Sequence, residues 1–341
     1  MDFIVRPLEE RDLPACLQLL RGHLAYPASV LPELPRVWRK LLREDAAVTA
    51  VAEGGSLDSK PGSILAFGMV VFVTDAWMAA SHTGQEPYLS VRTIRQELAG
   101  PSPILRPEAI RHENAGSGLN ALHLHYVAAP VAEEFRPALD YRMRLAFVED
   151  MRGYRIKAAL IELWDEVPPH AINGGPYPVV TDYADFFQRR GETPPLPGKR
   201  PFLLGVTRQE VLADFGRAVA PAFVETEPRL GFTRAEQLLL RQAILGYTDV
   251  ELARRLQLAL PTVKNRWRAL YDRLGRIAPE LVVESDASSN PAVRGQEKRR
   301  RLVDYVRRHP EELRPGLWRT RADRKGRASR FEATRTKSGR P

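Results

Sequence analysis

A segment rich in basic and amide side chains, LPTVKNRWRALYDRLG, occupies residues 260–275. Its apolar residues recur at i, i+4, i+7 and i+11 and predict one buried helix face: Val263, Trp267, Leu270 and Leu274. Lys264, Asn265 and Arg268 lie off this face. Lysine neutralises nucleic-acid phosphates, asparagine can pair with adenine, and arginine can pair with guanine. The chemistry expected of this helix is therefore the reading of double-stranded DNA.

Local signals predict two short helices in front of this segment. Each begins with a Ser/Thr-x-x-Glu capping box, formed by Thr233 with Glu236 and by Thr248 with Glu251. Gly246 suits the end of the first helix, and Pro261 suits the first turn of the third. Short helices joined by a tight turn, the last with an exposed basic face, predict a helix-turn-helix.

Residues 232–275 resemble the LuxR-type (GerE-like) DNA-binding domain without a gap, over 44 of 341 residues. The matching positions are Thr233, Glu236, Leu240, Gly246, Glu251, Ala253, Leu256, Thr262, Val263, Lys264, Leu274 and Gly275. The resemblance implies a bacterial transcription regulator in which Lys264, Asn265 and Arg268 face the major groove. It places Thr262 and nearby basic residues such as Arg266 toward phosphates.

Ala259, Pro261 and Arg266 depart from the LuxR-type pattern, and we expect these changes to affect sequence readout more than the fold. Two other interpretations of residues 232–275 stay open. One is a helical bundle that never touches nucleic acid, and the other is a promoter-binding region like region 4 of a sigma factor.

The net charge of +9 is unevenly distributed along the chain. Residues 276–341 contain 18 Lys and Arg against 9 Asp and Glu, whereas residues 1–231 contain 25 against 29. A helix is expected near residues 295–308, with the basic run Lys298, Arg299, Arg300 and Arg301. This run could bind phosphates beside the main domain, or the helix could dock through its apolar residues and leave its charges in solvent. From about Gly316 onward we expect a disordered tail.

The first 220 residues alternate strand-like and helix-like segments, which predicts an α+β domain with a mixed sheet and flanking helices. Strands are expected at 3–7, 46–53, 63–73, 120–129, 157–164 and 201–206, and a helix at 132–153. Residues 74–118 read as a long polar insertion. The order of elements, with the opening VRPLEERDL and the helix FFQRRG, resembles the GCN5-related N-acetyltransferase (GNAT) fold.

That family holds acetyl-coenzyme A through a glycine-rich loop whose backbone amides bind the pyrophosphate at a helix N-terminus. The equivalent stretch here, VAAPVAEEFRPALDYR, contains no glycine and places Glu133 and Glu134 where a phosphate would sit. We therefore expect no cofactor and no enzymatic activity, and interpret the domain as a sensor or assembly module. The alternative is an acyltransferase fused to a DNA-binding domain.

Other chemistry is sparse. His123 and His125 are two residues apart on one predicted strand, so they should share a face and could bind a metal or poise a base. No third ligand is identifiable, and we assign neither a metal site nor a catalytic residue. Four aromatic residues could line a small-molecule pocket, although core packing is the favoured interpretation: Trp77, Tyr126, Trp164 and Phe186. The single cysteine, Cys16, excludes an internal disulfide.

The sequence thus predicts a cytoplasmic transcription regulator without a membrane span, and a homodimer when bound to DNA. A small-molecule effector and RNA polymerase are further partners that the sequence leaves open. The expected domains are a GNAT-like regulatory domain at 1–220, a LuxR-type domain at 228–285, and a basic tail at 286–341.

Overall fold

The computed structural model describes residues 3–21, 26–54, 63–166, 177–214, 216–282 and 291–314. The chain divides into two compact units, Met1–Glu225 and Thr226–Pro341. The expected tail from Gly316 onward lies outside the described residues. No helix within the described ranges has the length and apolar character needed to cross a lipid bilayer.

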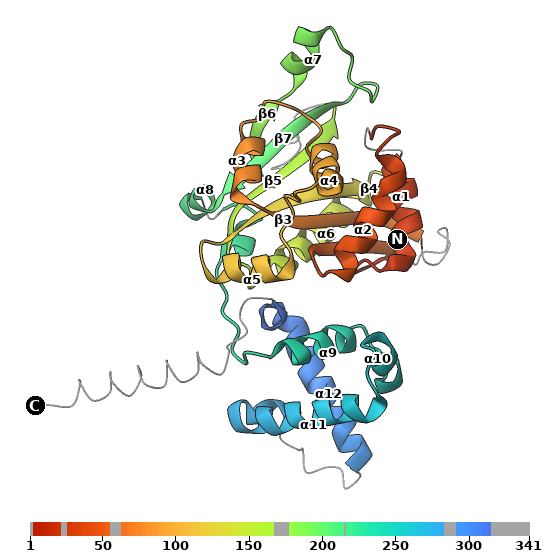
Figure 1. Ribbon diagram of the computed structural model, residues 1–341, viewed down its shortest axis with the longest axis vertical. Helices are drawn as coiled ribbons and strands as arrows, with labels where there is room; N and C mark the ends of the chain where they lie inside the picture. The colour runs from red at the N-terminus through yellow and green to blue at the C-terminus, as the bar shows by residue number, and fades with distance from the viewer. Residues whose placement is uncertain are drawn as a thin grey trace, which may run out of the picture. The chain divides into compact units, whose positions relative to one another are not determined.

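The first unit is built on a seven-stranded sheet in the order β1-β2-β3-β4-β5-β7-β6 (Figure 1). Its strands are β1 (Phe3–Arg6), β2 (Ala47–Gly54), β3 (Ser63–Val73), β4 (Leu119–Ala128), β5 (Ile156–Asp165), β6 (Val179–Asp182) and β7 (Arg200–Thr207). Among the described strand pairs, β4–β5 is parallel and the other five are antiparallel. The expected mixed sheet with flanking helices is confirmed.

Helices cover both faces of this sheet, so the central strands read as nearly continuous apolar runs. One face packs against α1 (Leu13–Arg21), α2 (Leu34–Arg43), α3 (Asp75–His82), α4 (Leu89–Ala99) and α7 (Ala184–Arg190). The other packs against α5 (Pro107–Ala115), α6 (Arg136–Met151) and α8 (Arg208–Ala213). We call these the α4 face and the α6 face. Helix α6 lies in the chain between β4 and β5 and allows them to run parallel.

Residues 74–118 correct one expectation, because they are not an irregular insertion. They form α3, α4 and α5, and their apolar residues Met78, Ile94 and Ile110 are buried in the two cores. Thr74 caps α3 by accepting a hydrogen bond from the Trp77 backbone amide. The segment GPSP lies between α4 and α5, and the glycines of NAGSG lie between α5 and β4. Helix α2 and the edge strand β6 were not anticipated.

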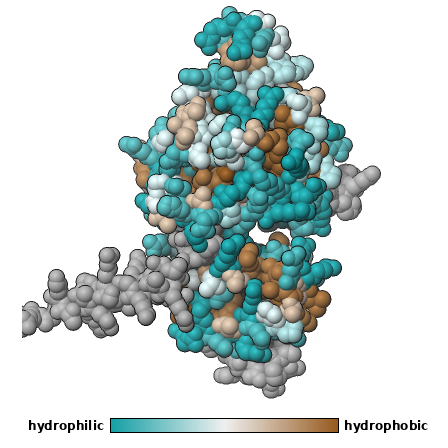
Figure 2. Space-filling view, in the orientation of Figure 1, coloured by the Kyte–Doolittle hydropathy of each residue, from teal (hydrophilic) through white to brown (hydrophobic). Residues whose placement is uncertain are grey.

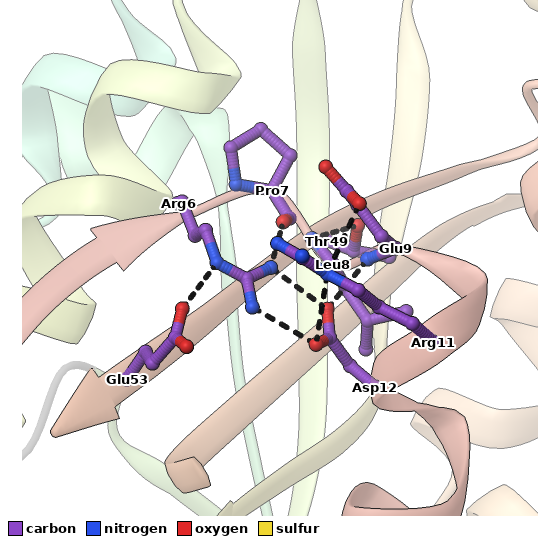
Figure 3. A network of polar contacts seen from close by, with 8 residues as sticks. All are labelled: Arg6, Pro7, Leu8, Glu9, Arg11, Asp12, Thr49 and Glu53. Carbon is purple, nitrogen blue, oxygen red and sulfur yellow. Dashed lines mark hydrogen bonds and ion pairs between the residues drawn. The ribbon is translucent and has the colours of Figure 1, made fainter. Parts of the chain in front are cut away.

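A polar network fastens the edge strand β1 to the rest of the sheet (Figure 3). The Arg6 guanidinium donates to both Asp12 carboxylate oxygens, at 2.7 and 2.9 Å, and to Glu53 on β2 at 2.7 Å. Asp12 also accepts from the Glu9 backbone amide at 2.8 Å. Burial opposes ionisation of Asp12, but the Arg6 hydrogen bonds, the Glu9 amide and the Arg6 charge outweigh it and lower its pKa. The network therefore stabilises the fold when Asp12 is ionised.

Replacing Asp12 with Asn should lower the free energy of unfolding by about 3 kcal/mol at pH 7, because Arg6 loses its buried partner. Since the folded-state pKa of Asp12 lies below its unfolded value, the contribution in the natural chain disappears as the pH falls through that folded value. Urea unfolding at pH 7 and at pH 3 should show a large difference between the two chains that shrinks in acid. Glu33→Gln, in an exposed pair with Arg36, is the matched control. An Asp12→Asn effect as small as that control would contradict this role.

The described part of the second unit contains four α-helices, followed by a short 3-10 turn. They are α9 (Arg234–Ile244), α10 (Asp249–Arg255), α11 (Leu260–Ile277), α12 (Pro291–Arg308) and the turn η6 (Pro310–Leu313). Both expected capping boxes are formed, Thr233 with Glu236 at α9 and Thr248 with Glu251 at α10. The expected apolar stripe of α11 faces the core, where Val263, Trp267, Leu270 and Leu274 are buried. On the visible face, apolar residues also reach the surface over α9 and α10 (Figure 2).

Helix α12 belongs to the same core, which corrects the expected separation of residues 286–341 as a tail. Its buried residues pack with those of α9 and α11: Leu302, Val303, Tyr305 and Val306. Beyond it, the buried Glu312 carboxylate accepts from the backbone amides of Arg229 and Leu230 and from the Tyr305 hydroxyl. The described part of the C-terminal segment is therefore bonded to the first residues of the second unit.

Leu302→Ala should destabilise the second unit by about 2–4 kcal/mol, since it deletes a fully buried side chain. Hydrogen exchange of α9 amides in the full chain measures this directly, because α9 packs on α12. Arg300→Ala, on the exposed side of α12, should leave that exchange unchanged. Equal exchange rates in the Leu302→Ala and natural chains would show that α12 does not contribute to the core.

Candidate functional site

The two parallel strands of the first unit pair over only part of their length. Leu119, Asn120, Ala121, Leu122 and His123 of β4 face Ile156, Ala158, Ala159, Leu160 and Ile161 of β5. Beyond His123 and Ile161 the strands continue without pairing to each other, over Leu124–Ala128 and Glu162–Asp165. We call these two unpaired stretches the fork. Ligand sites of sheets with parallel strands commonly lie at the carboxyl ends of those strands, so the fork is the first place to look for chemistry.

A β-bulge in β4 lies at the start of the fork. Met69 of β3 pairs with His125 and Val70 pairs with His123, so Leu124 has no partner of its own on β3. The extra residue turns the two histidines to opposite faces of the sheet. His125 packs against Trp38 and Phe67 on the α4 face, while His123 packs against Phe147 of α6. The expectation that His123 and His125 share a face is therefore wrong.

Hydrogen bonds fix the protonation of His125. The Trp38 indole N–H, which can only donate, points at His125 Nε2 at 2.9 Å, so the proton of the neutral ring resides on Nδ1. Nδ1 lies 3.4 Å from the Tyr26 hydroxyl and can donate to it. Burial lowers the pKa of His125 to about 3. His125 is thus a neutral group that orients Tyr26 and does not serve as a base at neutral pH.

The α4 helix supplies the next polar group of the fork. The Ser90 hydroxyl donates to the Leu124 carbonyl at 2.5 Å, so a side chain of α4 provides the hydrogen bond for the carbonyl oxygen of the bulged residue. Ser90 also lies against the Tyr26 hydroxyl. The side chains of Tyr26 and Ser90 remain partly exposed.

Glu162 is the charged residue that stands at the fork on the α4 face. It is the first β5 residue after the last β4–β5 pair. Its carboxylate accepts from the Leu89 backbone amide at 3.0 Å and from the Trp164 indole at 3.2 Å. Burial raises the pKa of Glu162 to about 7, although these hydrogen bonds and the charge of Arg92 act in the opposite direction. The residue as a whole is half-buried.

Such a carboxyl group is half-ionised at neutral pH and can accept or release a proton, the property required of a general base. The sequence analysis missed Glu162. A signal was present, because Glu162 interrupts the otherwise apolar run AALIELW of a buried strand. A carboxyl group at such a position must be neutral, paired or functional.

On the α6 face, polar side chains are paired with one another. His123 Nε2 lies 2.9 Å from the Tyr177 hydroxyl, and burial lowers the pKa of His123 to about 3. The Tyr126 hydroxyl donates to Asp140 of α6 at 2.6 Å, and Arg136 donates to the same carboxylate at 2.9 Å. Within the described ranges, no group of three His, Cys, Asp or Glu side chains is placed to hold a metal ion.

The start of α6 does not fit the pyrophosphate of a coenzyme A molecule. Glu133 and Glu134 stand exposed in the turn before the helix, where they would repel phosphate. Phe135 at the N-cap makes no side-chain capping bond, and Pro137 in the first turn lacks an amide hydrogen. The residues that the family likeness would assign to this group are therefore unsuited to it.

The four aromatic residues proposed for a pocket do not come together. Trp77, Trp164 and Phe186 pack along the core of the α4 face, whereas Tyr126 lies on the α6 face. The Trp164 indole donates a hydrogen bond to Glu162. Trp77 donates to Thr93, which joins α3 to α4. The four aromatic residues pack against the cores, which is the interpretation that the sequence favoured.

The residues expected to contact DNA lie on α11 and α12 of the second unit. Thr262, Lys264, Asn265 and Arg268 are exposed and Arg266 is half-buried. Arg268 donates to Asn265 at 3.0 Å. Their assignment as DNA contacts stays a prediction of the sequence.

The basic run of α12 is engaged in ion pairs within the second unit. Arg299 pairs with Asp249 at 2.7 Å and donates to the Tyr247 carbonyl. Arg300 and Arg301 pair with Glu297 at 3.0 Å, and Lys298 precedes them on the same helix. The apolar side of α12 is docked in the core of the second unit, and the assignment of the basic run to phosphate contacts stays a prediction.

Comparisons with known proteins yield neither a matching protein-family model nor a matching curated protein. Similar solved structures exist. A dodecameric spermidine N-acetyltransferase from Vibrio cholerae, in an intermediate state, is 12% identical with a TM-score of 0.32, covering 63% of this chain and 98% of that chain. Another structure of spermidine N-acetyltransferase from Vibrio cholerae, in complex with CoA and spermine, is 10% identical with a TM-score of 0.30, covering 62% and 98%.

The similar structures are named as acetyltransferases, and none of the comparisons supports the expectation of a DNA-binding transcription regulator that is not an enzyme. The LuxR-type resemblance of residues 232–275 receives no support from any of the comparisons. The fork of the first unit, where Glu162 lies between β5 and α4, is the candidate functional site.

Proposed function

We propose that the first unit is an enzyme that transfers an acyl group to an amine, with Glu162 as the general base. The observation that carries the proposal is a half-buried glutamate at the fork of a parallel strand pair, whose carboxyl group has a pKa of about 7. A base near its pKa at neutral pH combines a useful ionised fraction with sufficient proton affinity. An amine that arrives as an ammonium ion must lose a proton before its nitrogen can attack.

The backbone of the fork suits the acyl group. Beyond His123, β4 lacks a β5 partner, so amide groups on this edge of β4 can meet the carbonyl of a bound acyl group. Tyr26 and Ser90 border the same place from the α4 face. The resemblance of the order of elements to the GNAT fold also implies acyl transfer to an amine.

The reaction requires an acyl thioester as donor. The Glu162 carboxylate takes the proton that the ammonium ion loses before the attack. The amine nitrogen then forms a bond to the acyl carbon, and the carbon–sulfur bond breaks. The second proton of the nitrogen passes through solvent to the departing thiolate. Because the start of α6 does not fit a pyrophosphate, binding of the donor should depend little on the nucleotide part of a coenzyme A thioester.

Acyl transfer can be measured as thiol release from acetyl-coenzyme A or from the truncated thioester S-acetyl-N-acetylcysteamine, with a panel of amines that includes spermidine. We expect both donors to support the reaction with the natural chain. Glu162→Gln should lower kcat/KM by about 10²–10⁴-fold, the usual contribution of a general base. Glu166→Gln, just beyond β5 and exposed, is the matched control. Full activity of Glu162→Gln, or no transfer to any amine by the natural chain, would refute the proposal.

The same carboxyl group should make stability depend on pH. Its folded pKa of about 7 exceeds the ordinary value, so the folded state holds more protons than the unfolded state between about pH 4.5 and 7. Unfolding free energy should therefore fall as the pH rises through this window. Glu162→Gln removes the desolvated charge and should stabilise the chain by about 1–2 kcal/mol at pH 8, discounted for partial exposure, but not at pH 4. Calorimetric melting at both pH values checks this, and an equal gain at both would contradict it.

A further inference from the structure

Tyr88, which precedes α4, has an uncommon backbone conformation. Its φ of 67° and ψ of 39° lie in the left-handed region, where residues other than glycine are rarely found. It makes no side-chain capping bond for the helix that it opens. A strained residue of this kind persists only where its surroundings hold it, and it is often found beside a functional group.

The left-handed turn directs backbone amides at Glu162. The Leu89 amide donates to Glu162 Oε2 at 3.0 Å, and the Tyr88 amide before it acts in the same direction, lowering the pKa of that carboxyl group. Successive amides in a left-handed and then right-handed conformation form a concavity that binds anions. The positive end of the α4 dipole adds to this attraction.

Several contacts hold the turn in place. The Arg92 guanidinium donates to the carbonyl oxygens of Pro87 and Glu86 at 3.2 and 3.0 Å. The Tyr183 hydroxyl donates to the Glu86 carbonyl at 3.1 Å. The Tyr88 ring lies against Trp164, with 5.5 Å between ring centroids. The turn is therefore fixed from α4, from β5 and from the segment before α7.

We propose that Tyr88 is a positioning residue for Glu162, whose left-handed backbone places the Leu89 amide, with the Tyr88 amide beside it, at the carboxylate. This inference rests on the proposed function of Glu162 as a base, but its test does not. The other groups that face Glu162 are Arg92 on α4, the hydroxyls of Tyr26 and Tyr183, and the Trp164 indole. A substitution at residue 88 leaves these side chains in the chain but removes the Tyr88 ring, which packs against Trp164 and interacts with Glu162. The glycine and valine variants both lack that ring, so the difference between them reports on the backbone conformation.

The test is the titration midpoint of Glu162 in the full chain, followed by NMR of ¹³C-labelled glutamate carboxyl groups and assigned by the signal that Glu162→Gln removes. Tyr88→Gly keeps both amides and adopts the left-handed conformation freely, so its midpoint should stay near that of the natural chain. Tyr88→Val cannot adopt this conformation without strain. Its midpoint should rise, corresponding to at least about tenfold tighter proton binding. Tyr88→Phe is the control for the hydroxyl.

A second variant deletes one hydrogen bond without touching a side chain. Replacing Leu89 by its α-hydroxy acid, through nonsense suppression, exchanges its amide for an ester that cannot donate. This change should also raise the midpoint, and it stands in for Tyr88→Val if that variant fails to fold. Equal midpoints in the glycine and valine variants, or an unchanged midpoint in the ester, would overturn the inference. The titration needs no substrate, so a failure of the inference is distinguishable from an absence of acyl transfer.

Discussion

The end of pairing between β4 and β5 is the constraint on which the proposed chemistry depends. Parallel strands need a crossover, which α6 provides, and pairing stops at His123 and Ile161 where the bulge begins. From that point the α4 face can present Glu162 to a ligand while the sheet continues on either side. The hydrogen bonds between Arg6 and Asp12 and the helices of the α4 face stabilise the sheet around the fork.

Burial raises the pKa of Glu162 and hydrogen bonding lowers it, and the balance between them sets the value near 7 that suits a general base. Full burial without donors would keep the carboxyl group protonated, whereas an exposed carboxylate would be too weak a base. The amide of Leu89 and the indole of Trp164 offset part of the burial. His125 is the contrasting case, because Trp38 fixes it as a neutral ring whose role is to orient Tyr26.

Features encoded by neighbouring residues were predictable from the sequence. The strands around 63–73 and 120–129 and the capped helices α9 and α10 appear where alternation and capping boxes predict them. Features that depend on contacts between residues far apart in the sequence could not be predicted from it. A single extra residue at Leu124 breaks the alternation that placed two histidines together. Glu162 has its raised pKa only in the fold, where α4 packs against β5. The docking of α12 depends on a few apolar residues within a sequence that is otherwise strongly basic.

If Glu162 is the base, an amine must meet an acyl group beside its carboxylate. A crystal structure of the chain with an N-acetylated amine product would show where the two groups meet. We expect the product in the fork, with its amide nitrogen within about 3 Å of the Glu162 carboxylate and its acyl oxygen toward the edge of β4 that has no β5 partner. A product bound away from the fork, or bound there with its nitrogen remote from Glu162, would show that Glu162 is not the base.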